Sequence, residues 1–232
     1  MRERPRPPLG VVLAGGRSRR LGIDKTRLEL RREAASLTLV EWAARRLEPW
    51  CDAVVVAGPA SLAVDGRRAV EDALAPGPAG GILGAAREAP RRALMVLACD
   101  LPWLPAEALG RLTVPRDSAV DLALFRSAGG LEPLCALWGP RALELLAARC
   151  TAGDPSLSAI VEEEGIACAV LEGEALGAEA FFNLNRPLDL ERFLAREGTL
   201  TRRDPTDAQP GATPPPAGGA PRSPSSRRKS KR

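Results

Sequence analysis

A loop rich in glycine and basic side chains carries the most distinctive chemistry in this sequence. The apolar run Leu9–Ala14 ends at Gly15 and Gly16, and Arg20 and Lys25 follow shortly after. Glycine lets backbone N–H groups come close to a polyanion, while arginine and lysine neutralise its charge. The spacing fits neither the G-x-G-x-x-G motif nor the P-loop. The segment predicts a phosphate-binding loop; the alternative is an ordinary glycine turn followed by solvated basic side chains.

The rarity of lysine gives Lys25 particular weight. Lysine and arginine together number 33, yet Lys25 is the single lysine that precedes residue 229. Where arginine fills nearly every other basic position, one lysine suggests that a compact ammonium group is needed. Lys25 is therefore the candidate that neutralises charge on a bound phosphate.

A carboxylate follows the next strong strand pattern. The apolar run Ala93–Ala98 is followed by Cys99 and Asp100. Ligands of an open α/β sheet bind outside the carboxyl ends of its strands, so Asp100 is expected to face that crevice. A hard carboxylate suits Mg²⁺, which commonly takes one or two protein carboxylates together with substrate phosphates. The alternative is that Asp100 caps a helix beginning near Pro105.

Two further segments leave their roles open. Asp72 stands before a Gly/Pro-rich stretch at 76–81, where it could orient a ligand or be an ordinary surface acid. Asn183 and Asn185 lie directly before a predicted helix, where ligand contact and helix capping by Asn185 are equally good interpretations.

Composition excludes several classes of protein. The chain has no histidine and no tyrosine, which removes Ser-His-Asp and Cys-His hydrolases and zinc proteases. From residue 202 onward eight side chains are basic and two acidic, so the net charge of +4 belongs to the C-terminal segment. The rest is slightly acidic, and nucleic-acid binding by it is not expected.

Cysteine usage and hydropathy predict the compartment. The five cysteines are scattered without a C-x-x-C pair, as expected of buried, reduced thiols. No apolar stretch reaches the roughly 18 residues of a membrane span. The apolar run after the basic N-terminus is too short for a signal peptide. We therefore expect a cytoplasmic protein without a membrane partner.

Short apolar runs alternate with helical patterns along the chain. The predicted strands are Leu9–Ala14, Ala53–Ala57, Ala93–Ala98, Val120–Phe125, Leu134–Trp138 and Ile166–Leu171, and the predicted helices are Ser36–Glu48, Gly81–Glu88, Pro105–Leu112, Pro140–Cys150, Ser156–Glu164 and Pro187–Arg196. This alternation predicts an α/β fold with a mainly parallel sheet covered on both faces. We expect a flexible arm at 1–8, one domain at 9–200, and a disordered basic tail at 201–232 that is rich in Pro, Ser and Arg.

Four motifs together resemble a known family. The segment LAGGRSRRLGIDK resembles the L-A-G-G-x-S-x-R-M/L-G-x-D-K signature of molybdenum cofactor guanylyltransferases, which transfer GMP from GTP to molybdopterin and release pyrophosphate. The segments VEDALAPGPAGG, CDLPWLP and FFNLNRPLDL resemble three further motifs of that family and keep their order across residues 9–196. The pairing of LAGG with D-K favours guanylyl over cytidylyl or sugar-nucleotide transfer. Many members carry an Asn after the second strand, where this sequence has Ala57.

The resemblance implies a three-layer, Rossmann-like nucleotidyltransferase fold, a single domain with a mixed sheet. It implies that GTP and molybdopterin are the substrates, that Mg²⁺ is the cofactor, and that proteins of molybdoenzyme maturation are further partners. The implied roles are a nucleotide site at Leu13, Ala14, Gly15, Gly16 and Asp72, contact of Lys25 with the GTP phosphates, Mg²⁺ binding by Asp100, and an acceptor side at Asn183 and Asn185.

The expected chemistry needs no histidine. The attacking phosphate is already ionised at neutral pH, so catalysis reduces to in-line positioning and charge neutralisation. We expect Lys25 and Asp100 to be catalytic, with Arg20 assisting the leaving pyrophosphate. The alternatives are a transferase that uses CTP or another phosphorylated acceptor, and a non-catalytic nucleotide-binding partner module on the same fold.

Overall fold

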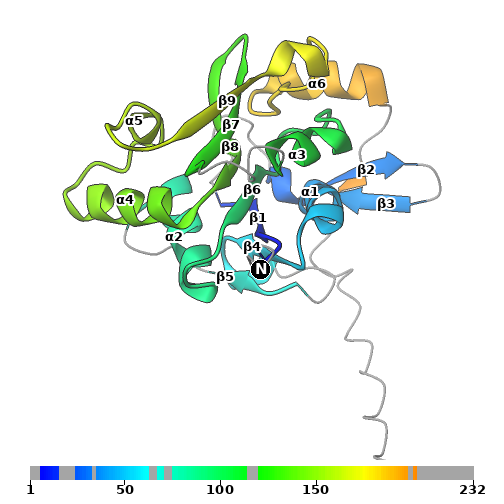
Figure 1. The fold of residues 1–232 in the computed structure, drawn as a ribbon. Helices are drawn as coiled ribbons and strands as arrows, with labels where there is room; N and C mark the ends of the chain where they lie inside the picture. The colour runs from blue at the N-terminus through cyan, green and yellow to red at the C-terminus, as the bar shows by residue number, and fades with distance from the viewer. Residues whose placement is uncertain are drawn as a thin grey trace, which may run out of the picture.

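The computed structural model describes residues 6–15, 24–32, 35–62, 67–70, 75–113, 120–197 and 201–202. Its central sheet has seven strands in the order β5-β4-β1-β6-β8-β7-β9 (Figure 1). The strands are β1 Leu9–Leu13, β4 Ala53–Ala57, β5 Ala69–Val70, β6 Leu94–Ala98, β7 Leu122–Ser127, β8 Gly130–Trp138 and β9 Cys168–Glu172. β8 runs against both of its neighbours, whereas the other described pairings in this sheet are parallel. The prediction of a mainly parallel, mixed sheet is confirmed.

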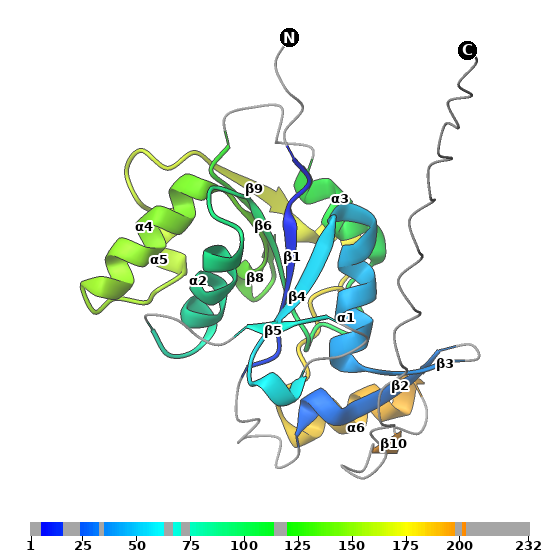
Figure 2. The same ribbon diagram turned by 90° about the horizontal axis from the view of Figure 1, so that it is seen from below.

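Helices cover both faces of this sheet and make a three-layer domain (Figure 2). One layer holds α2 Pro78–Glu88, α4 Pro140–Thr151 and α5 Ser158–Val161, and the other holds α1 Leu39–Leu47 and α3 Ala106–Thr113, with α6 Pro187–Glu197 contributing Phe193. The two hydrophobic clusters lie on opposite faces, because successive side chains of a strand point to opposite faces. The three-layer prediction is confirmed.

The two central strands explain why polar residues gather at one edge. β1 and β6 pair in parallel, and all five residues of each are buried. A parallel strand covered on both faces has room for polar side chains only beyond its ends. The residues that follow Leu13 and Ala98 therefore meet at the carboxyl edge of the sheet.

A small second sheet was not predicted. Its strands, in the order β10-β2-β3, are β2 Leu28–Arg32, β3 Ala35–Thr38 and β10 Thr201–Arg202, and both pairings are antiparallel. The helix predicted from Ser36 begins instead at Leu39, because β3 pairs with β2. Thr38 then caps α1 by accepting a hydrogen bond from the backbone N–H of Glu41 (3.2 Å), while its own N–H donates to the Glu41 carboxylate (2.7 Å).

The second sheet includes the first two residues of the predicted tail. Thr201 and Arg202 pair with Glu29 and Leu28 of β2, so ordered structure passes the predicted boundary at 200. Residues 203–232, and the first five residues of the predicted arm, lie outside the described residues. Most other predicted elements agree with the observed ones within a few residues. Among the described residues, no helix is both long and apolar enough to cross a membrane.

Two truncations separate the strand β10 from the rest of the tail. A chain ending at Arg202 should melt like the full chain, because the removed segment has few large apolar side chains to bury. A chain ending at Glu197 should lose about 1 kcal/mol or more through its missing strand hydrogen bonds, a melting point roughly 2–4 °C lower. Differential scanning calorimetry measures both. A large loss already in the Arg202 truncation would contradict the assignment.

Candidate active site

Three residues that are distant in the sequence meet at the carboxyl edge of the sheet. The ammonium group of Lys25 donates hydrogen bonds to Oδ2 of Asp100 (2.6 Å) and to Oδ1 of Asn185 (3.1 Å). Lys25 begins the short 3₁₀ helix that follows the glycine-rich loop, Asp100 follows β6, and Asn185 precedes α6. In Figure 2, α6 and the β2–β3 hairpin lie at the same end of the molecule. Three predicted site residues from three motifs therefore share one site.

Asp100 has the environment of a metal ligand. It is 8% exposed, and its Oδ1 atom is buried without a hydrogen-bond partner among the described residues. A buried carboxylate oxygen without a partner is costly. A hard divalent cation would satisfy it, since Mg²⁺ prefers oxygen ligands and combines one or two carboxylates with substrate phosphates. The predicted metal ligand thus fits the ion, and its carboxylate bonds to Lys25 instead of capping α3.

The local turn at Asp24 fixes the position of Lys25. Oδ1 of Asp24 accepts hydrogen bonds from the backbone N–H (3.1 Å) and the hydroxyl (2.6 Å) of Thr26. Such a turn is a recurrent role of Asp, whose side chain can bond its own backbone two residues on. The side chain of Lys25 is 13% exposed. The turn at Asp24 therefore holds the ammonium group of Lys25 in a partly buried position.

An aromatic stack holds the Asn185 segment against Asp100. The ring of Trp103 stacks on Phe182 with centroids 4.0 Å apart and on Phe193 at 5.9 Å. The backbone N–H of Leu184 donates to the carbonyl oxygen of Asp100 (3.0 Å). The segments containing Asp100 and Asn185 thus dock on each other through packing and one backbone hydrogen bond.

The two predicted amides differ in what they do. The side chain of Asn185 reaches Lys25, whereas Asn183 is exposed in the same segment. Oδ2 of Asp189, in the first turn of α6, accepts hydrogen bonds from the backbone N–H groups of Asn185 (3.1 Å) and Arg186 (2.7 Å), which directly precede the helix. The side-chain oxygen of Asn185 therefore lies in the site with Lys25, while its backbone N–H is bonded to Asp189.

Backbone groups build the neighbouring part of the edge. The carbonyl oxygen of Ala57 accepts hydrogen bonds from the N–H groups of Ala14 (3.0 Å) and Gly15 (3.1 Å), and the N–H of Gly58 donates to Val70 (2.9 Å). Leu13 and Ala14 are buried, and Gly15 is exposed where β1 ends. The three predicted nucleotide-site residues thus lie beside Asp100 on its β1 side.

The helix α2 begins at the same edge. Its N-cap, Gly77, has φ +75° and ψ −157°, a conformation that is open essentially only to glycine. Pro78 follows at the first helical position, where its missing N–H costs nothing. The glycine-rich stretch predicted at 76–81 therefore ends a strand-to-helix connection with free N–H groups at the helix start. Of the other predicted residues, Gly16, Arg20 and Asp72 lie outside the described residues.

The cysteine next to the site is not a nucleophile. Burial raises the pKa of the Cys99 thiol to about 12, and the negative charge of Asp100 adds to this shift. The thiol is therefore protonated at neutral pH, and only the thiolate is nucleophilic. All five cysteines are free, as the sequence predicts, and three of them are buried.

Sequence reasoning missed one ionisable residue near this edge, Glu132 on β8. Its side chain accepts a hydrogen bond from the Ser127 hydroxyl (2.5 Å). Glu132 stands before a proline inside a strand pattern, in Leu131–Leu134. Within sheets, proline is confined to edge strands and bulges. Pro133 was therefore the one sequence signal that could have marked this part of β8 as irregular.

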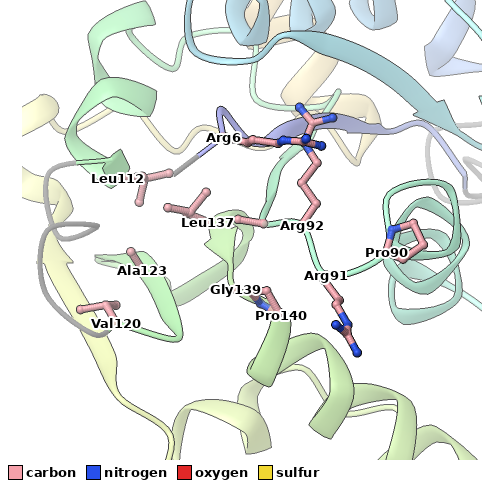
Figure 3. Close-up of a pocket in the computed structure, with 11 residues that line it drawn as sticks. Arg6, Pro90, Arg91, Arg92, Leu112, Val120, Ala123, Leu137, Gly139 and Pro140 are labelled. Carbon is pink, nitrogen blue, oxygen red and sulfur yellow. The ribbon is translucent and has the colours of Figure 1, made fainter. Parts of the chain in front are cut away.

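A separate cavity lies away from these residues, at the opposite ends of β6 and β8. It measures about 510 Å³, and Figure 3 shows Leu112, Val120 and Ala123 facing Arg92 and Gly139 across it. The guanidinium group of Arg92 donates to the carbonyl oxygen of Pro7 (2.8 and 3.0 Å) and pairs with Asp52. Its lining comes from the other end of the sheet and contributes nothing to the cluster around Asp100.

Fold and site together define a class of protein. An α/β sheet that gathers a lysine, a carboxylate suited to a metal, and backbone-lined turns at its carboxyl edge is built to bind a phosphorylated ligand there. Comparison with known proteins places the chain within that class. Residues 10–168 match the family described as the MobA-like NTP transferase domain.

Relatives and solved structures agree with this match. A molybdenum cofactor guanylyltransferase of Cereibacter sphaeroides is 33% identical over 202 residues, which cover 84% of this chain and 97% of the relative. A probable molybdenum cofactor guanylyltransferase of Pelotomaculum thermopropionicum is 35% identical over 194 residues, which cover 78% of this chain and 89% of the relative. The molybdopterin-guanine dinucleotide biosynthesis protein A of Archaeoglobus fulgidus has the same fold, with a TM-score of 0.65, 24% identity, and coverage of 79% of this chain and 95% of that one.

The chain belongs to the MobA-like NTP transferase family and is a nucleotidyltransferase. Use of a divalent metal is general in this class. The structure of a Mycobacterium tuberculosis protein with the same fold, in complex with manganese, has a TM-score of 0.56 at 20% identity and covers 83% of this chain and 100% of that one.

Proposed function

We propose that this chain transfers GMP from GTP to the phosphate of molybdopterin and releases pyrophosphate. The contact of Lys25 with both Asp100 and Asn185 carries the proposal, because it joins three motifs of the guanylyltransferases at one point. The matched relatives, named molybdenum cofactor guanylyltransferases, support the choice of substrates. The proteins that receive the product are proposed as further partners.

The reaction needs little covalent chemistry from the protein. An oxygen of the acceptor phosphate forms a bond to the α-phosphorus of GTP, and the bond from that phosphorus to the bridging oxygen breaks as pyrophosphate leaves. The acceptor phosphate is ionised at neutral pH, so a general base is unnecessary. Positioning and neutralisation of the phosphates then account for catalysis.

We assign each role to a side chain whose surroundings suit it. Asp100 would hold Mg²⁺ through its unsatisfied Oδ1, and the ion would supply positive charge against the phosphates. Lys25 neutralises phosphate charge from the partly enclosed position that the Asp24 turn gives it. Asn185 holds the ammonium group in the absence of nucleotide and faces the acceptor. Arg20, Gly16 and Asp72 keep their proposed roles toward pyrophosphate and nucleotide.

The direct test supplies the protein with Mg²⁺, molybdopterin and each nucleoside triphosphate in turn. We expect a guanine dinucleotide and stoichiometric pyrophosphate with GTP, detected by chromatography and a coupled phosphate assay. Comparable turnover with CTP would assign the chain to cytidylyl transfer, an outcome for which Ala57 leaves room because its side chain offers no amide to a base. Absence of a dinucleotide with every triphosphate would contradict the function.

Asp100→Asn tests the metal site. The variant keeps an oxygen at the same place but loses the charge. The Mg²⁺ concentration that gives half-maximal activity should rise by roughly ten- to a hundredfold, which corresponds to the free energy of one hydrogen bond to a charged group. Asp52→Asn, an exposed acid at the opposite edge of the sheet, is the matched control and should titrate like the wild type. Superimposable Mg²⁺ activation curves for Asp100→Asn and wild type would rule the assignment out.

Lys25→Ala tests charge neutralisation at the phosphates. We expect kcat to fall by roughly 10²–10³, as when one preorganised donor to developing charge is removed. Lys229→Ala removes the same charge from the basic tail and serves as the control, with unchanged kcat expected. The melting temperature shows whether Lys25→Ala still folds. A folded variant with near-normal release of pyrophosphate would exclude this role.

A further inference from the structure

Glu132 stands at the same edge as Asp100, on the side away from the nucleotide motifs. β8 pairs with β6 in antiparallel register, with Leu97 opposite Cys135, so β8 residues before Cys135 lie beyond the end of β6, where Asp100 follows. In the sheet order, β5, β4 and β1 lie to one side of β6, while β8, β7 and β9 lie to the other. Gly15 follows β1 on the first side, and Glu132 belongs to the second.

An irregularity of the sheet presents Glu132 there. β7 and β8 pair Leu124 with Ala136 but the next residue, Phe125, with Glu132, so residues 133–135 form a bulge in β8. Bulges are frequent beside active sites because they re-aim a side chain. Pro133 inside the bulge has no N–H to offer a neighbouring strand. The strand thus breaks its regular pairing at the point where its carboxylate approaches the edge.

The carboxylate of Glu132 is only partly satisfied by the protein. Ser127 donates a hydrogen bond to Oε1 (2.5 Å), and no salt bridge joins Glu132 to a basic side chain of the described residues. The side chain is half-buried. Burial raises the pKa of this carboxyl, and the charge of Asp100 raises it further, against the hydrogen bond from Ser127. The two acids therefore lie close enough to sense each other's charge across the site.

We propose that Glu132 is a specificity residue for the acceptor and binds the N–H edge of its pterin ring. This inference rests on the proposed function. A pterin carries an amino-pyrimidinone edge with two adjacent N–H donors, and a carboxylate accepts such a pair with its two oxygens. A partly buried acceptor that forms no salt bridge with the described residues suits this edge, whereas a phosphate would be repelled. Within the described residues Oε2 of Glu132 accepts no hydrogen bond, and Oε1 keeps a second lone pair beside its bond from Ser127, so both oxygens can accept from the ring.

Guanine presents the same donor edge, so position decides between the two rings. The backbone turns at Gly15 and Gly58 and the start of α2 lie on the β1 side of Asp100. The segment containing Asn185 docks onto Asp100 through Leu184, and Glu132 lies on the half of the sheet that continues into β7 and β9. The acceptor ring is therefore the ligand of Glu132, and recognition of guanine by it is the competing outcome of the test.

The test compares the full-length wild type with Glu132→Gln, Glu132→Asp and the control Glu172→Gln, an exposed acid on β9. KM for molybdopterin is measured at saturating GTP, and KM for GTP at saturating molybdopterin. Glu132→Gln removes the negative charge and replaces one of the two acceptor oxygens with an NH₂ donor, so KM for molybdopterin should rise about tenfold or more while KM for GTP stays within about twofold. Glu132→Asp should recover part of the loss, and the control should match the wild type.

A binding titration provides a readout that is independent of turnover. Pterin and lumazine, which has a carbonyl group in place of the pterin amino group, are titrated by fluorescence against wild type and Glu132→Gln. We expect the wild type to prefer pterin and the variant to lose that preference. This readout does not depend on dinucleotide formation, so a failure of the proposed function and a failure of pterin recognition by Glu132 give different results.

Three results would overturn the role of Glu132. A rise in KM for GTP instead of molybdopterin would assign it to guanine. A fall in kcat with both KM values unchanged would assign it to the reacting phosphates. Equal binding of pterin and lumazine by the wild type would show that the amino-pyrimidinone edge is not recognised.

Discussion

The ion pair between Lys25 and Asp100 is the contact on which the geometry of this site depends. Its side chains are 13% and 11% exposed, and charges so far removed from water are costly unless they neutralise each other. The pair can form only if the loop after β1 and the residue after β6 reach the same edge, which the parallel β1–β6 pairing ensures. One buried oxygen of Asp100 has no hydrogen-bond partner within the described part of the chain, and binding of a cation would satisfy it.

The order of strands separates two kinds of groups along the edge. β1 and β4 end in backbone turns that suit phosphates and a flat base, whereas β8 and the segment before α6 supply the polar side chains Glu132 and Asn185. Asp100 follows the strand between these halves. The proposed transfer needs its two substrates to meet, and a metal held by Asp100 in the middle of the edge would lie where they do so.

The sequence predicts those parts of the molecule whose structure follows from local residue patterns. Buried strands such as β1 and β6 are unbroken apolar runs, and Lys25 and Asp100 stand out by rarity and by position after a strand. The β2–β3 hairpin was missed because Ser36 and Thr38 also fit a helix start, and only pairing with β2 distinguishes the two. Glu132 was missed because its place depends on a bulge between strands that no local pattern encodes. The contact of Asn185 with Lys25 spans 160 residues and likewise follows from tertiary packing.

A chain without histidine can support this chemistry because the site works by charge and position. Burial raises the pKa of the Cys99 thiol and keeps it protonated at neutral pH. This cysteine, the nearest alternative nucleophile, is therefore unreactive there. The groups that the described residues bring together are an ammonium group, a carboxylate with one oxygen that they leave unbonded, and backbone N–H groups, all of which can act on phosphates without exchanging a proton. The aromatic stack of Trp103 on Phe182 packs the Asn185 segment against the segment that follows Asp100, and in the proposed reaction it would help to fix the distance between the two. Preorganisation of this kind replaces the acid–base machinery that the composition excludes.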